Sequence, residues 1–202
     1  MAAPGSFAFF PTALGPCAIA WNGIGLTGVW LPDKDANALR RKVLHRCGDA
    51  AETVPTGATA EVVDAIVRLL AGERVDLSTV ALDSSAVDAF DRRVYDVVRT
   101  IAAGSVLTYG EMAARVGADA SARAVGQSLG RNAMPIVVPC HRVVASGGLG
   151  GFSAPGGAST KRRMLAIEDA RPTGPPGLFD PTAEEGSADE AVASGREARS
   201  GH

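Results

Sequence analysis

The pentapeptide Pro139-Cys140-His141-Arg142-Val143 places a thiol directly beside an imidazole. A cysteine thiolate is a strong nucleophile, and an adjacent base or positive charge lowers the pKa of the thiol. A third group should orient the imidazole, and Glu168, near the end of the last helical segment, is a candidate. On its own, the same pair is equally compatible with a buried structural cysteine. The motif predicts nucleophilic chemistry at Cys140 only if other segments build a site around it.

The segments around this motif indicate how it is positioned. Residues 135–138 are apolar and typical of a short buried strand leading into Cys140. Because neighbouring side chains of an extended chain point to opposite faces, we expect His141 to reach Cys140 through a water molecule. A Gly-rich loop over 146–157 lacks the Gly-Lys-Ser/Thr spacing of a phosphate-binding loop. A final helix is expected from 159 to about 170.

Three helices are expected in succession between residues 84 and 130. The first should end at Gly104, and the second should begin with a capping box formed by Thr108 and Glu111 and stop at Gly117. The apolar stripe of the first helix, at helical spacing, comprises Phe90, Val94, Val98 and Ile101.

The third helix is expected from an N-cap at Asp119 to Gly130, directly after the tight link 117–118. Two short helices joined in this way are the signature of a helix-turn-helix, with the third helix as recognition helix. Its side chains are unusually small, which allows close approach to DNA but does not supply the long donors that read major-groove bases. They are Ala118, Ala120, Ser121, Ala122, Ala124, Gly126 and Ser128.

The chain is expected to divide into an α/β N-terminal domain over 1–83, a mostly α C-terminal catalytic domain over 84–170, and a tail over 171–202. The tail is acidic and rich in Pro, Gly and Ser, so we expect it to be disordered. The N-terminal domain should be a small sheet with helices. Its expected strands are 7–10, 17–21 and 26–31, and its expected helices are 35–47 and 60–71.

Composition excludes several classes of protein. Three cysteines are too few and too scattered for a disulfide framework, and a reducing, cytoplasmic setting would keep a thiol usable. Cys17 and Cys47 fall within the apolar pattern without paired Cys or His spacing, so we expect core residues and no metal site. The sequence contains no apolar run long enough to span a membrane, and its first ten residues lack the pattern of a secretory signal.

The net charge of −2 conceals an uneven distribution. Residues 171–202 hold three basic and six acidic residues, whereas 88–170 hold ten basic and seven acidic. Charge alone leaves open whether the basic part contacts a polyanion or is a solvated face. The stretch 120–167 contains no acidic residue and six basic ones, namely Arg123, Arg131, Arg142, Lys161, Arg162 and Arg163.

Pro-Cys-His-Arg-Val and its flanking segments resemble the O6-alkylguanine-DNA alkyltransferases, also called methylated-DNA–protein-cysteine methyltransferases. The resemblance covers most of residues 6–170 and is strongest over 90–168. Four matches occur in the order and spacing of that family: Tyr109 in Leu-Thr-Tyr-Gly-Glu, Arg123 in Ala-Arg-Ala-Val-Gly, Asn132 in Gly-Arg-Asn, and Cys140.

The resemblance implies DNA repair by direct damage reversal, in which Cys140 irreversibly accepts the alkyl group of O6-alkylguanine, once per molecule. O4-alkylthymine is a second candidate lesion. It further implies that His141 takes the thiol proton through water, that Glu168 orients His141, and that Asn132 holds the turn that brings the third helix against the active-site strand. Because transfer to a thiolate gives a stable thioether, no cofactor is expected.

For the substrate, the resemblance implies that Tyr109 donates a hydrogen bond to the departing guanine, while the backbone of Val143 and the region of Ser153 contact the base. Arg123 would take the place of the extruded base in the duplex. The expected partner is double-stranded DNA, and the protein is expected to act as a monomer. The expected fold is an RNase H-like N-terminal domain followed by a winged-helix or helix-turn-helix domain that binds DNA and carries out catalysis. The expected DNA-binding residues are Ser121, Ala122, Arg123, Ala124 and Arg131.

Two departures from the family pattern concern the substrate pocket. Ala133 follows the hinge Asn132 where the family commonly has Pro, and the loop 152–157 is about two residues longer than in many members. Because this loop should wall the guanine pocket, the sequence leaves the preferred alkyl size open.

Three other readings compete with repair. A lesion-flagging DNA binder would lack the acceptor cysteine, a winged-helix regulator would not need Cys-His-Arg, and a cysteine hydrolase would not need Arg123 and Tyr109. Stoichiometric methylation of Cys140 would separate repair from all three.

Overall fold

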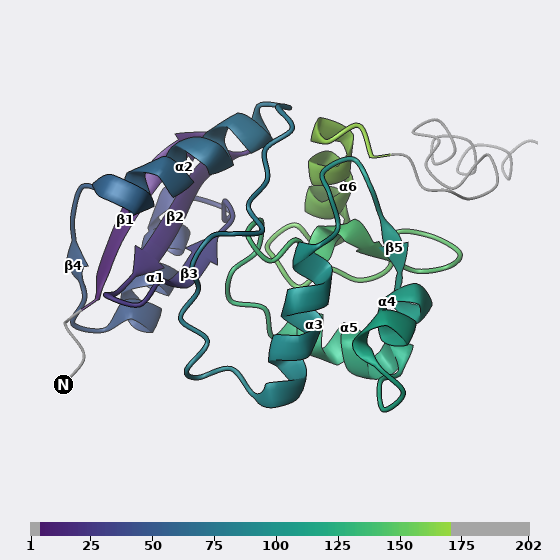
Figure 1. Ribbon diagram of the computed structural model, residues 1–202. Helices are drawn as coiled ribbons and strands as arrows, with labels where there is room; N and C mark the ends of the chain where they lie inside the picture. The colour runs from purple at the N-terminus through teal and green to yellow at the C-terminus, as the bar shows by residue number, and fades with distance from the viewer. Residues whose placement is uncertain (1–4, 171–202) are drawn as a thin grey trace, which may run out of the picture. The chain divides into compact units, whose positions relative to one another are not determined.

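A four-stranded sheet with the strand order β3-β2-β1-β4 opens the fold of the computed structural model, which describes residues 5–170 (Figure 1). The first three strands are antiparallel neighbours, and the last pairs in parallel with β1. The three expected strands are confirmed; β4 was not expected, since it is two exposed residues long. The strands are β1 (Ser6–Thr12), β2 (Gly15–Trp21), β3 (Leu26–Trp30) and β4 (Ala51–Glu52).

Alternate side chains of the sheet enter two different apolar clusters. On one face Phe7 and Ala18 pack with residues of α1 (Ala36–Cys47), whose N-terminus is capped by Asp35. On the other face the fully buried Cys17 joins the cluster that contains residues of α2 (Gly57–Leu70). The alternation follows from the two-residue period of a strand, and it places one helix on each face of the sheet (Figure 1).

Helix α3 (Ala89–Arg99) packs Val94, Val98 and the partly buried Phe90 of the expected apolar stripe against this second cluster, and Ile101 is buried just beyond its end. It ends at Arg99, five residues before Gly104, so the expected end was wrong. The amide of Ile101 already bonds back to the carbonyl of Val98 in a tighter turn. Gly104 instead lies in the following turn, with φ +83°.

The expected pair of short helices is present as α4 (Tyr109–Val116) and α5 (Ala122–Gly130). The capping box of Thr108 and Glu111 is formed, and Gly117 caps the C-terminus of α4. The expected N-cap of α5 was wrong by two residues. The hydroxyl of Ser121 accepts a hydrogen bond from the α5 backbone, whereas Asp119 forms an ion pair with Arg93 of α3.

Two short strands connect the pair of helices to the Cys140 motif. Strand β5 (Leu107–Thr108) pairs in parallel with β6 (Val143–Val144), which follows the motif directly. The pairing holds Tyr109, the first residue of α4, close to the segment after Cys140. The last helix is α6 (Gly157–Ile167), two residues longer at its start and three shorter at its end than expected, with Glu168 as its C-cap.

One apolar cluster joins the sheet, α2 and the helices after residue 88. The backbone N–H of Val29 in β3 also donates to the carbonyl of Ala133, at 2.9 Å. All described residues lie within one compact unit. The boundary at residue 83 stays a prediction, and the expectation for the tail falls outside the described residues. Within residues 5–170, no helix combines the length and apolar character needed to cross a membrane.

The capping box provides a test of how the start of α4 is held. Thr108→Ala should lower the free energy of unfolding by about 1 kcal/mol, because the N–H of Glu111 loses its side-chain acceptor. Chemical denaturation of both proteins measures the difference. Thr56→Ala is the matched control, because Thr56 is the N-cap of α2 without a side-chain cap hydrogen bond. An equal loss in both variants would contradict the capping role.

Candidate active site

The segment before Cys140 is a series of turns, so the expected strand over 135–138 was wrong. Ile136 has φ +76°, a left-handed conformation that a β-branched residue rarely adopts and that is incompatible with a strand. The residues from Met134 to Val138 are nevertheless buried, apart from the half-buried Pro135. The sequence therefore indicated burial correctly, but apolar character alone does not distinguish a buried turn from a buried strand.

The side chain of Asn132 organises these turns. Its Oδ1 accepts from the backbone N–H of Met134 at 2.9 Å, and its Nδ2 donates to the carbonyl of Val138 at 2.8 Å. The same Nδ2 lies 3.2 Å from Sγ of Cys140, to which it donates. The side-chain amide of Asn132 thus provides hydrogen bonds that a neighbouring strand would provide in a sheet, and it also holds the thiol in place.

Cys140, His141 and Arg142 form one turn of 3-10 helix, and all three side chains are buried. From the sequence we expected an extended chain here, and from it a water molecule between Cys140 and His141. The chain is a helical turn instead, so that reason for the water does not hold. His141 faces Glu168, with 2.9 Å between Nε2 and Oε1. Arg142 donates to both oxygens of the same carboxylate, from Nη2 at 2.8 Å and from Nε at 2.9 Å.

The pKa values of this group follow from burial and pairing. Burial works to raise the pKa of Glu168, but the hydrogen bonds from His141 and Arg142 outweigh it and lower the pKa to about 2. Burial lowers the pKa of His141, against the opposing effect of Glu168. At neutral pH the carboxylate is therefore ionised and the imidazole neutral. Its Nε2 must carry the hydrogen that Glu168 accepts, which leaves Nδ1 unprotonated.

Burial also raises the pKa of the Cys140 thiol, while hydrogen bonds from Asn132 and from backbone N–H groups and the charge of Lys161 oppose this effect. The resting side chain is consequently a thiol that needs a proton acceptor to react. Nδ1 of His141 is buried and has no hydrogen-bond partner among residues 5–170. It is the one nitrogen of this ring with a free lone pair.

Lys161 is a site residue that sequence reasoning missed. Its side chain is 0 % exposed, and Nζ donates to the carbonyls of Val143 at 2.7 Å and Gly151 at 3.2 Å. Nζ also lies 5.7 Å from the centre of the Tyr109 ring. Burial lowers the pKa of Lys161 to about 8. The signal was available, because Lys161 shares a helical face with the buried Met164, Leu165 and Glu168.

A pocket of about 390 Å³ opens beside the thiol. Tyr109 lines one side, with its hydroxyl donating to the carbonyl of Gly151 at 3.4 Å. Gly150 has φ +70°, and a Cβ there would stand 3.0 Å from the Tyr109 ring, so a side chain would press on the pocket wall. The remaining lining residues are Ala122, Gly126, Leu129, Gly130, Cys140, Gly151, Phe152 and Ser153.

Helix α5 borders this pocket and also presents an exposed surface. Arg123 is exposed in its first turn, next to the exposed Ser121 and Ala122 and the half-buried Ala124. The guanidinium of Arg131, at the end of the helix, instead binds both carboxylate oxygens of Asp91 in α3. Its predicted contact with DNA would have to compete with that pair.

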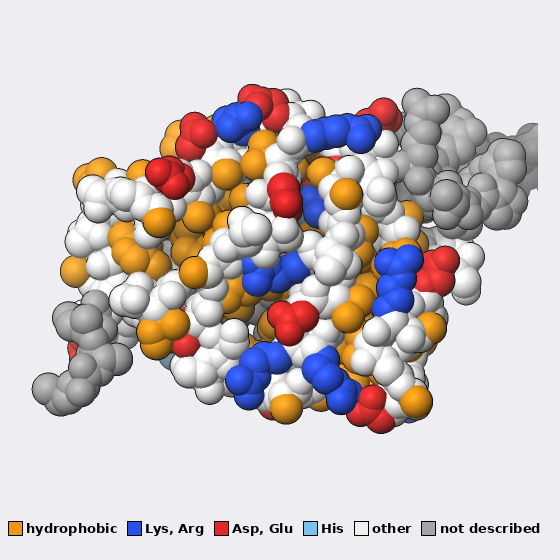
Figure 2. Space-filling model, viewed as in Figure 1, with side chains coloured by type: hydrophobic (Ala, Val, Ile, Leu, Met, Phe, Trp, Pro, Cys, Tyr) orange, Lys and Arg blue, Asp and Glu red, His pale blue; other side chains and the backbone are white. Residues whose placement is uncertain are grey.

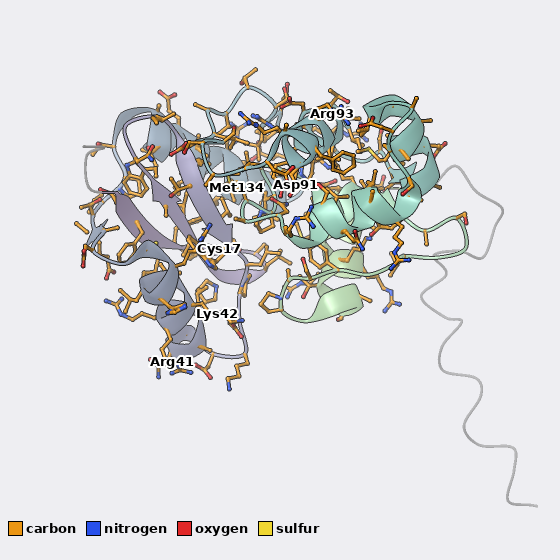
Figure 3. The ribbon with its side chains drawn as sticks, turned by 90° about the horizontal axis from the view of Figure 1, so that it is seen from below. Cys17, Arg41, Lys42, Asp91, Arg93 and Met134 are labelled. Atoms are coloured by element: carbon orange, nitrogen blue, oxygen red, sulfur yellow. The ribbon has the colours of Figure 1, made fainter. Side chains whose placement is uncertain are left out.

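The basic stretch 120–167 is not one solvated face. Arg142 and Lys161 are buried, and Arg163 donates to the carbonyls of Ala13 and Leu14. On the face shown in Figure 2, basic and acidic side chains are interspersed. Figure 3 labels Asp91 and Arg93 on α3; Asp91 is buried and pairs with Arg131, whereas Arg93 is exposed and pairs with Asp119. In the part of the chain that the structure describes, no cluster of three or more His, Cys, Asp or Glu side chains could hold a metal ion.

By their names, the sequence relatives of this chain are methyltransferases that act on methylated DNA. Residues 89–170 match the family model described as 6-O-methylguanine DNA methyltransferase, DNA binding domain. A methylated-DNA–protein-cysteine methyltransferase of Mycobacterium bovis is 36 % identical over 168 residues, which are 83 % of this chain and 94 % of the relative. One of Methanothermobacter thermautotrophicus is 42 % identical over 118 residues, which are 58 % of this chain and 65 % of that relative.

Solved structures agree with these relatives. The DNA complex of Mycobacterium tuberculosis OGT has a TM-score of 0.63 at 31 % identity, covering 81 % of this chain and 92 % of the other. The O6-methylguanine-DNA methyltransferase of Pyrococcus kodakaraensis has a TM-score of 0.62 at 28 % identity, covering 80 % and 98 %. The chain belongs to the methylated-DNA–protein-cysteine methyltransferase family.

Proposed function

We propose that this protein repairs DNA by direct reversal, transferring the alkyl group of O6-alkylguanine to Cys140. The observation that carries the proposal is the thiol itself, which lines a pocket and is held by Asn132 within one turn of a buried His141–Glu168 pair. The bond from Sγ to the alkyl carbon forms as the bond from that carbon to O6 breaks. The thioether product has no easy hydrolysis, so each molecule acts once and needs no cofactor.

In this mechanism His141 receives the thiol proton at Nδ1, through a bridging water molecule. Glu168 fixes the tautomer by accepting the Nε2 hydrogen and stabilises the imidazolium that forms. Arg142 keeps the carboxylate ionised, because two of its nitrogens donate to it. The departing guanine carries the electron pair of the broken bond and takes up a proton in place of the one that the thiol lost.

The pocket beside Cys140 would hold the extruded base. Tyr109 lines it and can redirect its hydroxyl from the long 3.4 Å contact with Gly151 to the guanine. Ser153 lies in its wall. The carbonyl of Val143 already accepts from Lys161, so its predicted contact with the base would use its second lone pair. Lys161 then acts by fixing Val143 and Gly151, two parts of the same wall.

Helix α5 would enter the minor groove, with Ser121, Ala122 and Ala124 allowing close approach and Arg123 filling the gap left by the base. The proposal includes a helix-turn-helix of α4 and α5 within a winged-helix domain over 84–170, and an RNase H-like domain over 1–83, acting as a monomer. A reduced thiol and access to DNA favour a cytoplasmic setting.

The central experiment follows the alkyl group. Incubation with duplex DNA carrying O6-methylguanine should add one methyl to Cys140, detected by intact-protein and peptide mass spectrometry. Cys140→Ala should abolish transfer and retain DNA binding, whereas Cys17→Ala and Cys47→Ala should retain transfer. Turnover beyond one equivalent would indicate a hydrolase, and DNA binding without any mass change would indicate a regulator.

Glu168 should contribute to stability in a pH-dependent way. Its pKa is lowered in the folded state, so its contribution is complete above its ordinary value near 4.5 and is lost as pH falls toward 2. Glu168→Gln should therefore cost about 2 to 4 kcal/mol of unfolding free energy at pH 7, with a gap to the unsubstituted protein that narrows below pH 4.5. Urea denaturation from pH 7 to pH 3 measures the gap, and exposed Glu73→Gln is the control. A gap independent of pH would contradict this assignment.

Arg123 tests base extrusion. Extrusion costs a few kcal/mol, so Arg123→Ala should slow transfer from duplex DNA by about ten- to a thousand-fold. Transfer from free O6-benzylguanine should hardly change, because nothing has to leave a duplex. Arg123→Lys should also be slow, because lysine lacks the flat guanidinium. Arg115→Ala is the control, because Arg115 is an exposed arginine of α4. Equal slowing on both substrates would assign Arg123 to the pocket or the fold instead.

A further inference from the structure

A separate pocket of about 320 Å³ is bordered by Arg142, the arginine that binds the carboxylate of Glu168. It shares no lining residue with the pocket beside Cys140, and none of its lining residues lies in α4 or α5. Its walls come from the segment between α2 and α3, from the end of α3 and from the turn that follows it. The pocket is therefore distinct from the site of alkyl transfer and from the proposed DNA-binding helices.

Three arginines and one acid line this pocket. One of the arginines, Arg142, is paired with Glu168. The acid, Asp76, accepts hydrogen bonds from the backbone N–H and the hydroxyl of the residue two positions further on. The other two arginines, Arg74 and Arg99, form no ion pair within residues 5–170. Two positive charges without a paired carboxylate thus stand against one negative charge, and the pocket is net positive.

Arg99 is half-buried and is held by neutral groups alone. Its Nη2 donates to the carbonyls of Leu77 at 3.3 Å and Val80 at 2.6 Å. Its Nε is buried without a hydrogen-bond partner in the described part of the chain, where Nη1 forms no hydrogen bond either. Burial lowers the pKa of Arg99, because a charge removed from water is poorly solvated. An anion in the pocket would supply the negative charge that this guanidinium lacks.

Arg74 lies against the turn that follows α3. Gly104 in this turn has φ +83°, and a Cβ there would stand 3.6 Å from Nη2 of Arg74. Ala102 and Ala103 of the same turn line the pocket, and within residues 5–170 neither of their backbone N–H groups donates to a backbone carbonyl. Backbone N–H groups beside guanidinium groups are typical components of anion-binding sites.

We propose that this pocket binds a small anion that carries a phosphate group, held by Arg74, Arg99 and the turn 102–104. A planar guanidinium matches the oxygens of phosphate in bidentate pairs, and two such groups suit a doubly charged anion. The volume is near the lower end of the range for small-molecule sites, which fits inorganic phosphate or a small phosphate monoester. The bound anion would lie beside Arg142, whose guanidinium holds Glu168.

The first experiment locates the binding. The isotope-labelled full chain is titrated with inorganic phosphate at constant ionic strength and followed by NMR. The amide signals of Ala102 and Ala103 should shift and saturate, with a dissociation constant of about 1 mM or lower. Chloride in place of phosphate should leave these signals unshifted.

Titrations with adenosine monophosphate and adenosine identify the source of the phosphate group. Tighter binding of the monophosphate than of inorganic phosphate assigns the site to a phosphate monoester, and equal binding assigns it to free phosphate. Adenosine should produce no shift at these amides, since it lacks the anion.

Substitutions test the charges. Arg74→Glu should weaken phosphate binding by at least about fivefold, because a repulsive charge replaces an attractive one. Arg41→Glu is the matched control with the same change of net charge. Arg41 is exposed on α1 (Figure 3) and does not line the pocket, so this variant should keep its affinity. Asp76→Asn should tighten binding by about two- to fivefold, because it removes the acid of the pocket.

Thermal unfolding provides an independent readout, because a ligand that binds the folded state alone raises Tm. Phosphate should raise the Tm of the unsubstituted protein, and Arg74→Glu should largely remove this effect. Equal phosphate affinity of Arg74→Glu and the unsubstituted protein, the absence of a saturable shift, or shifts confined to other segments would each overturn the proposal. Displacement of phosphate by an undamaged DNA duplex would also overturn it, because the pocket would then belong to the DNA interface. None of these measurements involves alkyl transfer, so their outcome is independent of the proposed function.

Discussion

The carboxylate of Glu168 holds the active centre together. It is 7 % exposed and accepts from one histidine nitrogen and two arginine nitrogens, at 2.8 to 2.9 Å. A buried charge of this kind is tolerated only when its partners satisfy it, and removing one partner leaves the others uncompensated. The shared carboxylate therefore fixes the orientation of His141, the position of Arg142 and the end of α6 at the same time.

Asn132 has a comparable role on the other side of the thiol. Its amide bonds the backbone of Met134 and Val138 and donates to Sγ of Cys140. If residues 134–138 formed a strand, their backbone would bond to a neighbouring strand, and the position of the thiol would depend on that sheet. Turns held by a side chain allow Ile136 to adopt a left-handed conformation and place Cys140 at the start of a helical turn.

The positive charge of the chain contributes more to internal structure than its distribution in the sequence suggests. Arg142 and Lys161 bond acceptors in the interior, and Arg131 pairs with Asp91. The exposed Arg123 therefore stands out on the small surface of α5, because its neighbours in the first turn are Ser121, Ala122 and Ala124. A single long cation on a surface of small side chains is suited to insertion into a duplex, since the helix itself can approach closely.

The sequence by itself determined the elements that depend on local rules. The pattern of apolar residues predicted β1 to β3 and α1 to α3, and capping residues such as Thr108 with Glu111 predicted α4 and α5, because both signals act within a few residues. The motif around Cys140, with Tyr109, Arg123 and Asn132, also identified the family. Only the tertiary structure decided that 134–138 forms buried turns and that β3 lies beside the loop at Ala133. The second of these depends on a partner distant in sequence, because Val29 bonds Ala133, and no local pattern encodes such a pairing.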